Sequence, residues 1–350
     1  MKLRENVPLA ELTTMRLGGP ARFVIEAETE DDVREAYDFA LEKRLPLYPL
    51  GSGANSLGLD FGFPGIILLN RLKGFEILNQ SKTRLLVKAF GGEIWDDFVA
   101  FTCQKGFADL AVLSKIPGTV GAAPVQNIGA YGGEAKDTLK SVSVYDSLLD
   151  EFRELAADDC DFAYRHSIFN SGETKGRYFI LSATFELTKP SLAPPFYNSL
   201  QAYLDAHGIS DYSPDNLRAA VSEIRKEKLP DPETTPSAGS FFKNLYAPAS
   251  EKARLEALGL SLRETADGTY KLNVAQVLEL SGLKGKVFHG FEISEKAPLV
   301  LINRSGTSYA DLEAAVLEIT KIVREKFGLT LEPEPVPIRD SASSEEPARA

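Results

Sequence analysis

A stretch of 18 residues near the middle of the chain, 116–133, limits the possible folds more than any other feature. It contains five glycines and two prolines and has no charged side chain. Proline lacks a backbone donor and glycine relaxes the backbone, so a long regular helix or strand is excluded here. The polar pair Gln126–Asn127 also excludes a membrane-spanning helix. Exposed backbone N–H groups in such a loop can cradle a phosphate. A buried crossing loop packed through small residues is the alternative.

A second glycine-rich loop, residues 50–57, follows an apolar run that is typical of a strand. Its spacing, G-x-G-x-x-S, is close to the dinucleotide-binding fingerprint but lacks the third glycine. The fingerprint also opens a helix, whereas residues 58–64 are rich in glycine and proline. A Rossmann domain is therefore not expected. Two separate loops that can each cradle phosphate indicate a long dinucleotide held between them.

The two loops together resemble the FAD-binding loops of the UDP-N-acetylenolpyruvoylglucosamine reductase family. Further family motifs follow in the family's order, and the resemblance spans about residues 13–338. These motifs are Tyr164–Phe169, Lys228–Pro232, Gly239–Asn244 and Leu331–Glu334. The resemblance implies an enzyme that uses NADPH and FAD to reduce UDP-N-acetylglucosamine enolpyruvate to UDP-N-acetylmuramate, a precursor of bacterial peptidoglycan. The subtype implied carries an extra tyrosine-bearing segment.

The fold class that the resemblance implies is α+β, with a two-lobed FAD-binding domain of the vanillyl-alcohol-oxidase/PCMH type and a C-terminal α+β substrate-binding domain. Lobe 1 is expected at residues 1–72, lobe 2 at 73–229 and the substrate-binding domain at 230–330. Residues 331–339 are expected to return to the site of lobe 1. The tail, residues 340–350, is rich in Ser, Ala and Glu, so we expect it to be disordered.

Composition narrows the classes of partner. The 350 residues exceed one ordinary domain, and a net charge of −11 argues against a nucleic-acid partner. Cys103 and Cys160 lack CxxC spacing and the three histidines are scattered, so we expect reduced thiols and no metal site. The N-terminus lacks the apolar core of an export signal. We therefore expect a cytoplasmic monomer that acts on a small molecule, with no membrane partner.

Hydrophobic periodicity and breakers predict the main elements. A helix is expected after Thr29, with Asp32 as its capping-box partner, and a second capping box is expected at Ser308 and Asp311. Further helices are predicted over Gly92–Gln104, Asp215–Lys228 and Ser308–Phe327. Strands are predicted over Arg22–Glu26, Leu45–Leu50, Gly65–Asn70, Phe75–Leu78, Arg84–Ala89, Leu139–Tyr145, Tyr178–Leu187, Leu299–Asn303 and Leu329–Leu331.

The resemblance assigns cofactor contacts to both loops. Neither loop contains His or Cys, so we expect FAD to be bound non-covalently, with NADPH as the co-substrate. The cofactor-binding residues expected are Gly51, Ser52, Gly53, Ala54, Asn55, Ser56, Pro117, Gly118, Thr119, Gly121, Ala122, Gln126, Asn127, Ile128, Gly129 and Tyr131.

Three residues match the catalytic positions of the family. Arg165 matches the arginine that meets the substrate carboxylate, and its permanently charged fork suits a carboxylate that turns into an enolate. Ser240 matches the proton donor to the α-carbon. Glu334 matches the second glutamate of the Glu-Pro-Glu motif, expected to act as a neutral acid that donates a hydrogen bond. Without the resemblance, Arg165 would be interpreted as a surface arginine and Ser240 as a serine in a turn.

Three further residues match contacts to the substrate nucleotide. Lys228 and Asn244 lie in family motifs, and Tyr197 lies in the breaker-rich segment Pro190–Asn198. In the subtype with the extra segment, this tyrosine folds over the nucleotide. Composition alone favours a surface linker for the same segment.

Two other functions fit part of these observations. One is an FAD-linked oxidase of the vanillyl-alcohol-oxidase type, against which the motifs of Ser240, Glu334 and Lys228 count. The other is a flavin-binding or nucleotide-binding module that has lost catalysis, against which the presence of all three catalytic residue types counts. Stoichiometric oxidation of NADPH on adding the enolpyruvyl substrate would separate the three.

Overall fold

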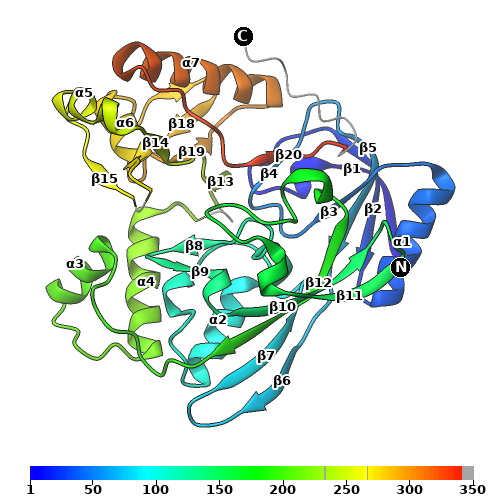
Figure 1. Cartoon of the computed structure of the whole chain (residues 1–350). Coiled ribbons are helices and arrows are strands. Elements are labelled where there is room, and N and C mark those ends of the chain that lie inside the picture. The colour runs from blue at the N-terminus through cyan, green and yellow to red at the C-terminus, as the bar shows by residue number, and fades with distance from the viewer. Residues whose placement is uncertain (232–233, 266, 341–350) are drawn as a thin grey trace.

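Three groups of elements follow one another along the chain in the computed structural model, which describes residues 1–231, 234–265 and 267–340 (Figure 1). A blue N-terminal lobe lies beside a cyan and green lobe, and a yellow-to-orange C-terminal part lies over both. The predicted disordered tail is residues 340–350, and all of it except Asp340 lies outside the described residues. Pro232, the last residue of the motif Lys228–Pro232, lies outside them too.

The first lobe is built on a four-stranded sheet with the order β1-β2-β5-β3, in which β2, β5 and β3 are parallel and β1 is antiparallel to β2. Its main helix, α1 (Glu30–Lys43), begins at the predicted capping box, where Asp32 N donates to Thr29 Oγ1 at 3.1 Å. The strands are β1 (Lys2–Pro8), β2 (Pro20–Ala27), β3 (Leu47–Leu50) and β5 (Phe63–Asn70). Strand β1 was not predicted, because six of its seven residues are exposed and leave no apolar alternation.

The second lobe is built on a five-stranded antiparallel sheet with the order β11-β10-β12-β7-β6. Its strands are β6 (Phe75–Gln80), β7 (Leu85–Phe90), β10 (Leu139–Asp146), β11 (Glu151–Ala156) and β12 (Tyr178–Leu187). The side of β12 that faces the helices is fully buried, since Ala183, Phe185 and Leu187 have no exposed surface.

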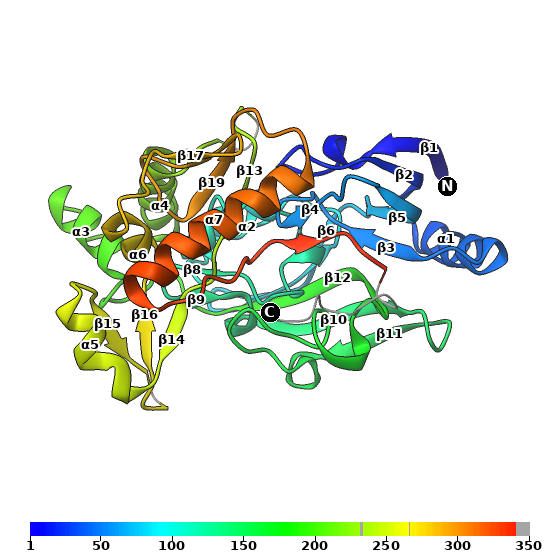
Figure 2. The ribbon, with the colours of Figure 1, turned by 90° about the horizontal axis from the view of Figure 1, so that it is seen from above.

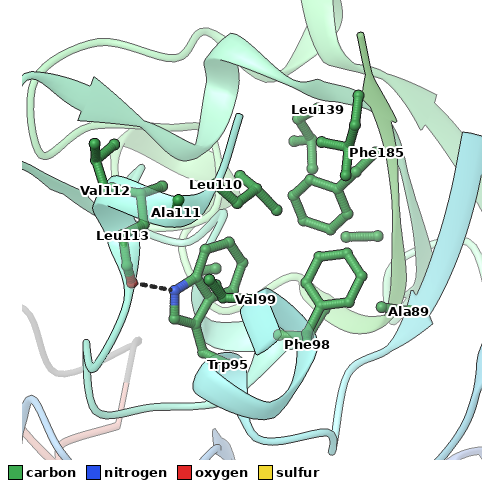
Figure 3. Close-up of a cluster of buried hydrophobic side chains, with 14 of the residues drawn as sticks. Ala89, Trp95, Phe98, Val99, Leu110, Ala111, Val112, Leu113, Leu139 and Phe185 are labelled. Carbon is green, nitrogen blue, oxygen red and sulfur yellow. Dashed lines mark hydrogen bonds between the residues drawn. The ribbon is translucent and has the colours of Figure 1, made fainter. Parts of the chain in front are cut away.

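An aromatic core joins this sheet to helix α2 (Trp95–Gln104) (Figure 3). Phe98 packs on Phe185 with ring centroids 4.9 Å apart. The indole of Trp95 donates from Nε1 to Leu113 O at 3.0 Å, so burying the ring leaves no unpaired donor. Helix α2 begins three residues later than predicted. Gly92 belongs to the preceding turn, because its N–H donates to Leu72 O at 2.9 Å.

Helix α4 (Pro214–Lys228) packs against α2, and helix α3 (Asn198–Ala206) packs against the other side of α4 (Figure 1). Helix α4 follows Ser213 and begins with proline at its first position, where the missing N–H is harmless. Helix α3 was not predicted, although the buried pair Leu200 and Leu204 has helical spacing. The breaker-rich segment before it therefore leads into a packed element.

The C-terminal part has two small sheets and three helices among its described residues. One sheet has the order β13-β19-β18-β17 and the other β14-β16-β15. The strands are β13 (Ser237–Ser240), β14 (Leu245–Ala247), β15 (Leu262–Glu264), β16 (Tyr270–Leu272), β17 (Val287–Phe288), β18 (Phe291–Ile293) and β19 (Val300–Asn303). The helices are α5 (Lys252–Ala257), α6 (Val274–Leu280) and α7 (Tyr309–Phe327). Helix α7 has the predicted capping box, and Gly328, at φ +70°, ends it.

Contacts distant in sequence dock this part on the first lobe. The carboxylate of Asp60 accepts hydrogen bonds from Tyr309 N at 2.5 Å and Ala310 N at 3.0 Å, and so caps α7 from another domain. The chain then returns, and β20 (Val336–Pro337) pairs in parallel with β4 (Ser56–Leu57) (Figure 2). The strand predicted over residues 329–331 is wrong. In this segment β-bridge pairing starts at Pro333, which pairs with Phe242. The local sequence does not indicate where pairing begins, because the partner residues lie in distant parts of the chain.

Within the described part of the chain, no helix is both long and apolar enough to cross a membrane. The same part holds no cluster of three or more His, Cys, Asp or Glu side chains suited to a metal ion. Cys103 and Cys160 are both buried and unpaired with each other.

Candidate functional site

The first glycine-rich loop leaves β3 and ends in β4, so strands hold it at both ends. Gly53 has φ +69°, and a Cβ there would overlap the carbonyl of Leu12. Only glycine fits this close approach of two backbones. The predicted strand-to-loop transition after Leu50 is confirmed.

The second loop has short 3₁₀ and strand pieces and no long regular element. Residues Val120–Ala122 form one 3₁₀ turn, and β8 (Gly129–Ala130) pairs with β9 (Gly133–Glu134). Gly118 has φ +142° and a Cβ there would meet nothing within 4 Å among the described atoms, so its backbone borders open space. Such bare backbone is available to a ligand.

The two loops meet at two points. Asn55 Nδ2 donates to Gln126 Oε1 at 3.2 Å. A Cβ built on Gly51 would stand 2.8 Å from Thr119 Oγ1 and 3.4 Å from the Cβ of Ala122. Residues that lie 71 positions apart in the chain, such as Asn55 and Gln126, thus form one continuous surface.

The residues at this surface fit a bound FAD. Thr119 Oγ1 is buried and has no hydrogen-bond partner among the described residues, which is unusual for a hydroxyl. A phosphate or ribose oxygen at this point would satisfy it. The uncharged, side-chain-poor loops also suit a pyrophosphate that is bound through backbone N–H groups. Thr119, Gly51 and their neighbours therefore form a suitable cradle.

One predicted cofactor residue uses its side chain to hold the loop itself. Asn127 Nδ2 donates to Glu134 Oε2 at 2.9 Å and to Ala163 O at 3.1 Å, and its Oδ1 accepts from Lys136 N at 3.0 Å. Both side-chain donors of this fully buried amide are therefore engaged within the protein. Its backbone N–H is engaged too, since it donates to Pro124 O at 3.2 Å, so Asn127, at φ +45°, shapes the loop from within.

Arg165 and Glu334 form an ion pair at the junction of the lobes. Arg165 Nε donates to Glu334 Oε1 at 2.7 Å, and the two side chains are 20% and 10% exposed. Arg165 has φ +56°, a conformation uncommon for a residue with a side chain, and its Nη2 lies 3.5 Å from Gly129 O. The predicted catalytic arginine is thus a half-buried side chain beside the second loop, which excludes the surface-arginine alternative.

The C-terminal part delivers Glu334 and Ser240 to the same place. Glu334 N donates to Phe241 O at 2.8 Å, so the glutamate lies beside the strand residue that follows Ser240. A bond from Lys243 N to Glu332 O at 2.9 Å continues this pairing. Ser240 itself is exposed at the end of β13, after Gly239 at φ +70°. Serine and glutamate therefore lie on two adjacent paired segments.

The three residues expected to contact the substrate nucleotide lie in different parts of the fold. Asn244 Nδ2 lies 3.5 Å from the hydroxyl of Tyr164, and its Oδ1 accepts from Val274 N at 3.3 Å. Tyr197, which is 50% exposed, packs its ring edge to face on Tyr131, with centroids 6.1 Å apart. Lys228 is exposed at the last turn of α4. The tyrosine thus contacts the second loop, which a free surface linker would not do.

Sequence reasoning missed one group of side chains. Lys271 lies 4.7 Å above the ring of Tyr164, and Tyr164 packs edge to face on Tyr246 at 6.2 Å. Burial and the nearby Arg165 lower the pKa of Lys271. No motif spacing joins these residues, since they come from the second lobe and from β14 and β16. Only the fold brings this cationic and aromatic group to Arg165.

The glycine-rich loops of the two lobes join into one cradle, and a further domain places polar side chains at its edge. This arrangement defines a flavoprotein of the two-lobed FAD-binding class. The comparisons agree with this class. A family described as FAD binding domain matches residues 21–148, and the C-terminal domain of UDP-N-acetylenolpyruvoylglucosamine reductase matches residues 231–338. The chain belongs to the UDP-N-acetylenolpyruvoylglucosamine reductase family.

Relatives named UDP-N-acetylenolpyruvoylglucosamine reductase match over nearly the whole chain. That of Pseudomonas aeruginosa is 36% identical, covering 96% of this chain and 98% of its own. That of Dechloromonas aromatica is 37% identical, covering 95% and 98%. The crystal structure of the reductase from Thermus caldophilus superposes with a TM-score of 0.66 at 22% identity, covering 96% and 99%. The family and the α+β fold class predicted from the sequence are confirmed.

Proposed function

We propose that this chain is an FAD- and NADPH-dependent reductase that converts UDP-N-acetylglucosamine enolpyruvate to UDP-N-acetylmuramate. The observation that carries the proposal is the meeting of Arg165 and Glu334 beside the strand of Ser240 and the second glycine-rich loop. These three residues match the catalytic positions expected from the family resemblance. The family names of the relatives point to the same reaction.

The cradle of Gly51, Thr119 and their loop neighbours would hold FAD without a covalent bond, since neither loop has His or Cys. When bound, FAD supplies hydride chemistry between NADPH and the methylene carbon of the enolpyruvyl group. The protein's tasks are then to bind the two substrates, to stabilise the charge that develops and to place a proton.

Arg165 would bind the carboxylate of the enolpyruvyl group. Reduction at the methylene carbon leaves negative charge on the α-carbon and this carboxylate, and a half-buried guanidinium stabilises such charge strongly. The bonds of Arg165 to Glu334 and Gly129 O fix its direction before substrate binds. Its charge is therefore preorganised.

Ser240 would donate the proton that completes the product at the α-carbon. Its hydroxyl is exposed at the end of β13, so it can reach a bound substrate. Glu334, hydrogen-bonded through its own N–H to Phe241 O, is held on the adjacent segment. In the structure Glu334 Oε1 accepts a hydrogen bond from Arg165 Nε at 2.7 Å, so the glutamate and the arginine act at the same point of the site.

The nucleotide end of the substrate would lie toward Lys228, Asn244 and Tyr197. Lys228 is an exposed cation suited to a diphosphate, and Asn244 offers amide groups for a base. Tyr197, already against Tyr131, offers a ring for the substrate to pack on. We assign residues 1–72 with 331–339 and residues 73–229 to the FAD-binding lobes, and 230–330 to the substrate-binding domain.

The test is an absorbance spectrum of the purified protein, followed by addition of NADPH with and without the enolpyruvyl substrate. We expect a flavin spectrum, release of the colour into the supernatant on acid precipitation, and one NADPH oxidised per substrate added. Oxygen consumption with a small alcohol and no NADPH turnover would instead indicate the oxidase alternative. Colour retained in the acid pellet would contradict non-covalent binding.

A further inference from the structure

Lys115, the residue immediately before the second glycine-rich loop, has a strained backbone that three contacts hold in place. Its φ is +60°, which is uncommon for a residue with a side chain. Its N–H donates to Asp96 Oδ1 at 2.7 Å, and its ammonium pairs with Asp96 Oδ2 at 2.8 Å. Its carbonyl accepts from Arg225 Nε at 3.1 Å. Such a conformation persists only where its surroundings hold it, so these contacts set how the loop begins.

The other end of the same loop is held in a similar way. Tyr131 has φ +50°, and its hydroxyl interacts electrostatically with the guanidinium of Arg225. The ring of Tyr131 packs edge to face on Tyr197 with centroids 6.1 Å apart. One arginine therefore contacts both the entrance and the exit of the loop.

Arg225 lies on helix α4, which also anchors the entrance through a second arginine. Arg218, seven residues earlier and so on the same face, binds Asp96 with two hydrogen bonds of 2.6 and 2.9 Å. Figure 1 shows α4 beside α3, with β8 and β9 on its other side. Helix α3 begins directly after Tyr197, and α4 ends at Lys228. Helix α4 therefore carries Lys228 itself and packs against α3, which begins after Tyr197. Both residues are expected substrate contacts.

Desolvation explains why this arrangement needs its hydrogen bonds. Arg225 is half-buried, and burial lowers its pKa, while the Tyr131 hydroxyl and the charge of Asp96 act in the opposite direction. A guanidinium withdrawn from water is destabilising unless it is well hydrogen-bonded. A methionine or leucine would fill the same space at lower cost, so packing does not account for a charged group here.

We propose that Arg225 is a positioning residue that ties both ends of loop 116–133 to helix α4 and, through Tyr131, places Tyr197 over the substrate nucleotide. The inference rests on the proposed function, since it takes this loop to hold FAD and Tyr197 to contact substrate. It follows that one substitution at Arg225 weakens FAD retention and nucleotide binding together, and leaves the chemical step intact.

The experiment compares Arg225→Met, Tyr131→Phe, the double variant and the matched control Lys226→Met, whose exposed side chain lies on the same turn of α4. FAD release from the holoenzyme is followed by flavin fluorescence after dilution, and KM for the enolpyruvyl substrate and kcat are measured with FAD in excess. We expect Arg225→Met to speed FAD release and raise KM by roughly tenfold each, as loss of a hydrogen bond to a charged group implies. The kcat should stay within about twofold, and Lys226→Met should match the wild type.

The double variant decides whether Arg225 acts through Tyr131. We expect it to be no worse than Arg225→Met alone, because the tyrosine hydroxyl can no longer position the loop once its partner is gone. The inference would be overturned if the effects of the two single substitutions multiplied in the double variant. It would also be overturned if Arg225→Met released FAD at the wild-type rate. If Arg225→Met does not fold, Tyr131→Phe must by itself speed FAD release and raise KM, and an unchanged variant would refute the proposal. Failure of the wild type to oxidise NADPH would overturn the proposed function, while the FAD-release comparison would still stand.

Discussion

Gly51 and Thr119 face each other so closely that a side chain added at Gly51 would press on the threonine hydroxyl. A Cβ on Gly51 would lie 2.8 Å from Thr119 Oγ1, and this hydroxyl is buried without a partner among the described residues. The pair therefore combines a steric restriction with an unused hydrogen-bonding group. Both properties suit a cradle that is completed by its cofactor.

The substitution Gly51→Ala should weaken FAD binding by at least about tenfold, because the new methyl group would displace Thr119 from the cradle. Adding Thr119→Ala to it should restore part of the affinity, since the displaced hydroxyl is then gone. FAD retention during gel filtration of the holoenzyme, with melting temperature as the folding control, gives the comparison. A double variant that binds FAD worse than Gly51→Ala would show that the close contact is not the cause.

Replacing Ser240 by Ala should separate the two half-reactions. Reduction of the bound flavin by NADPH needs no proton from this hydroxyl, so its rate should stay near that of the wild type. Reoxidation by the enolpyruvyl substrate should slow by at least about 10²-fold, the lower range for a positioned acid. Stopped-flow absorbance measures each half-reaction separately. Equal slowing of both would assign Ser240 a structural role, and no slowing of either would mean that the proton comes from another group.

The conservative substitution Arg165→Lys should lower kcat by about 10²-fold or more. Lysine keeps the charge but cannot reproduce the directed bonds of Arg165 to Glu334 and Gly129 O. Steady-state kinetics with the exposed Arg22→Lys as the matched control gives the measurement. A variant with nearly normal kcat would show that charge alone is sufficient at this position.

Asp146 predicts a pH dependence of stability in the second lobe. Its fully buried carboxylate pairs with Arg177 at 2.6 Å and with Arg153 at 3.1 Å, and Arg177 above all lowers its pKa to about 2. A lowered pKa means that the stabilisation is complete above the unfolded value near 4 and is lost as pH falls through about 2. It amounts to roughly 2 kcal/mol.

The variant Asp146→Asn should therefore melt well below the wild type at pH 7, and the difference between them should shrink as the pH falls from about 4 to 2. Asp158→Asn, at an exposed carboxylate on the same lobe, should change the melting temperature little at any of these pH values. Thermal melts at several pH values test this. A gap between Asp146→Asn and wild type that stays constant down to pH 2 would contradict the role given to the ion pairs.

Much of the fold was readable in local patterns. The capping boxes at Thr29 and Ser308 and the strand-to-loop transition at Leu50 all form as predicted, because each depends on residues within a few positions. Elements without such local signals were missed. Strand β1 is an exposed edge, and residues 331–337 pair only with distant segments.

The sequence by itself determined the family, the two glycine-rich loops and the identity of the expected catalytic residues, since residue type and order carry these. Only the tertiary structure decided which groups meet. Arg165 reaches Glu334 across 169 positions, and Arg225 reaches both ends of a loop that begins more than ninety residues earlier. No spacing in the chain encodes such contacts, because they arise from how separate lobes dock. Burial then sets how strongly each charged group interacts with its neighbours, and burial is a property of the packed molecule alone.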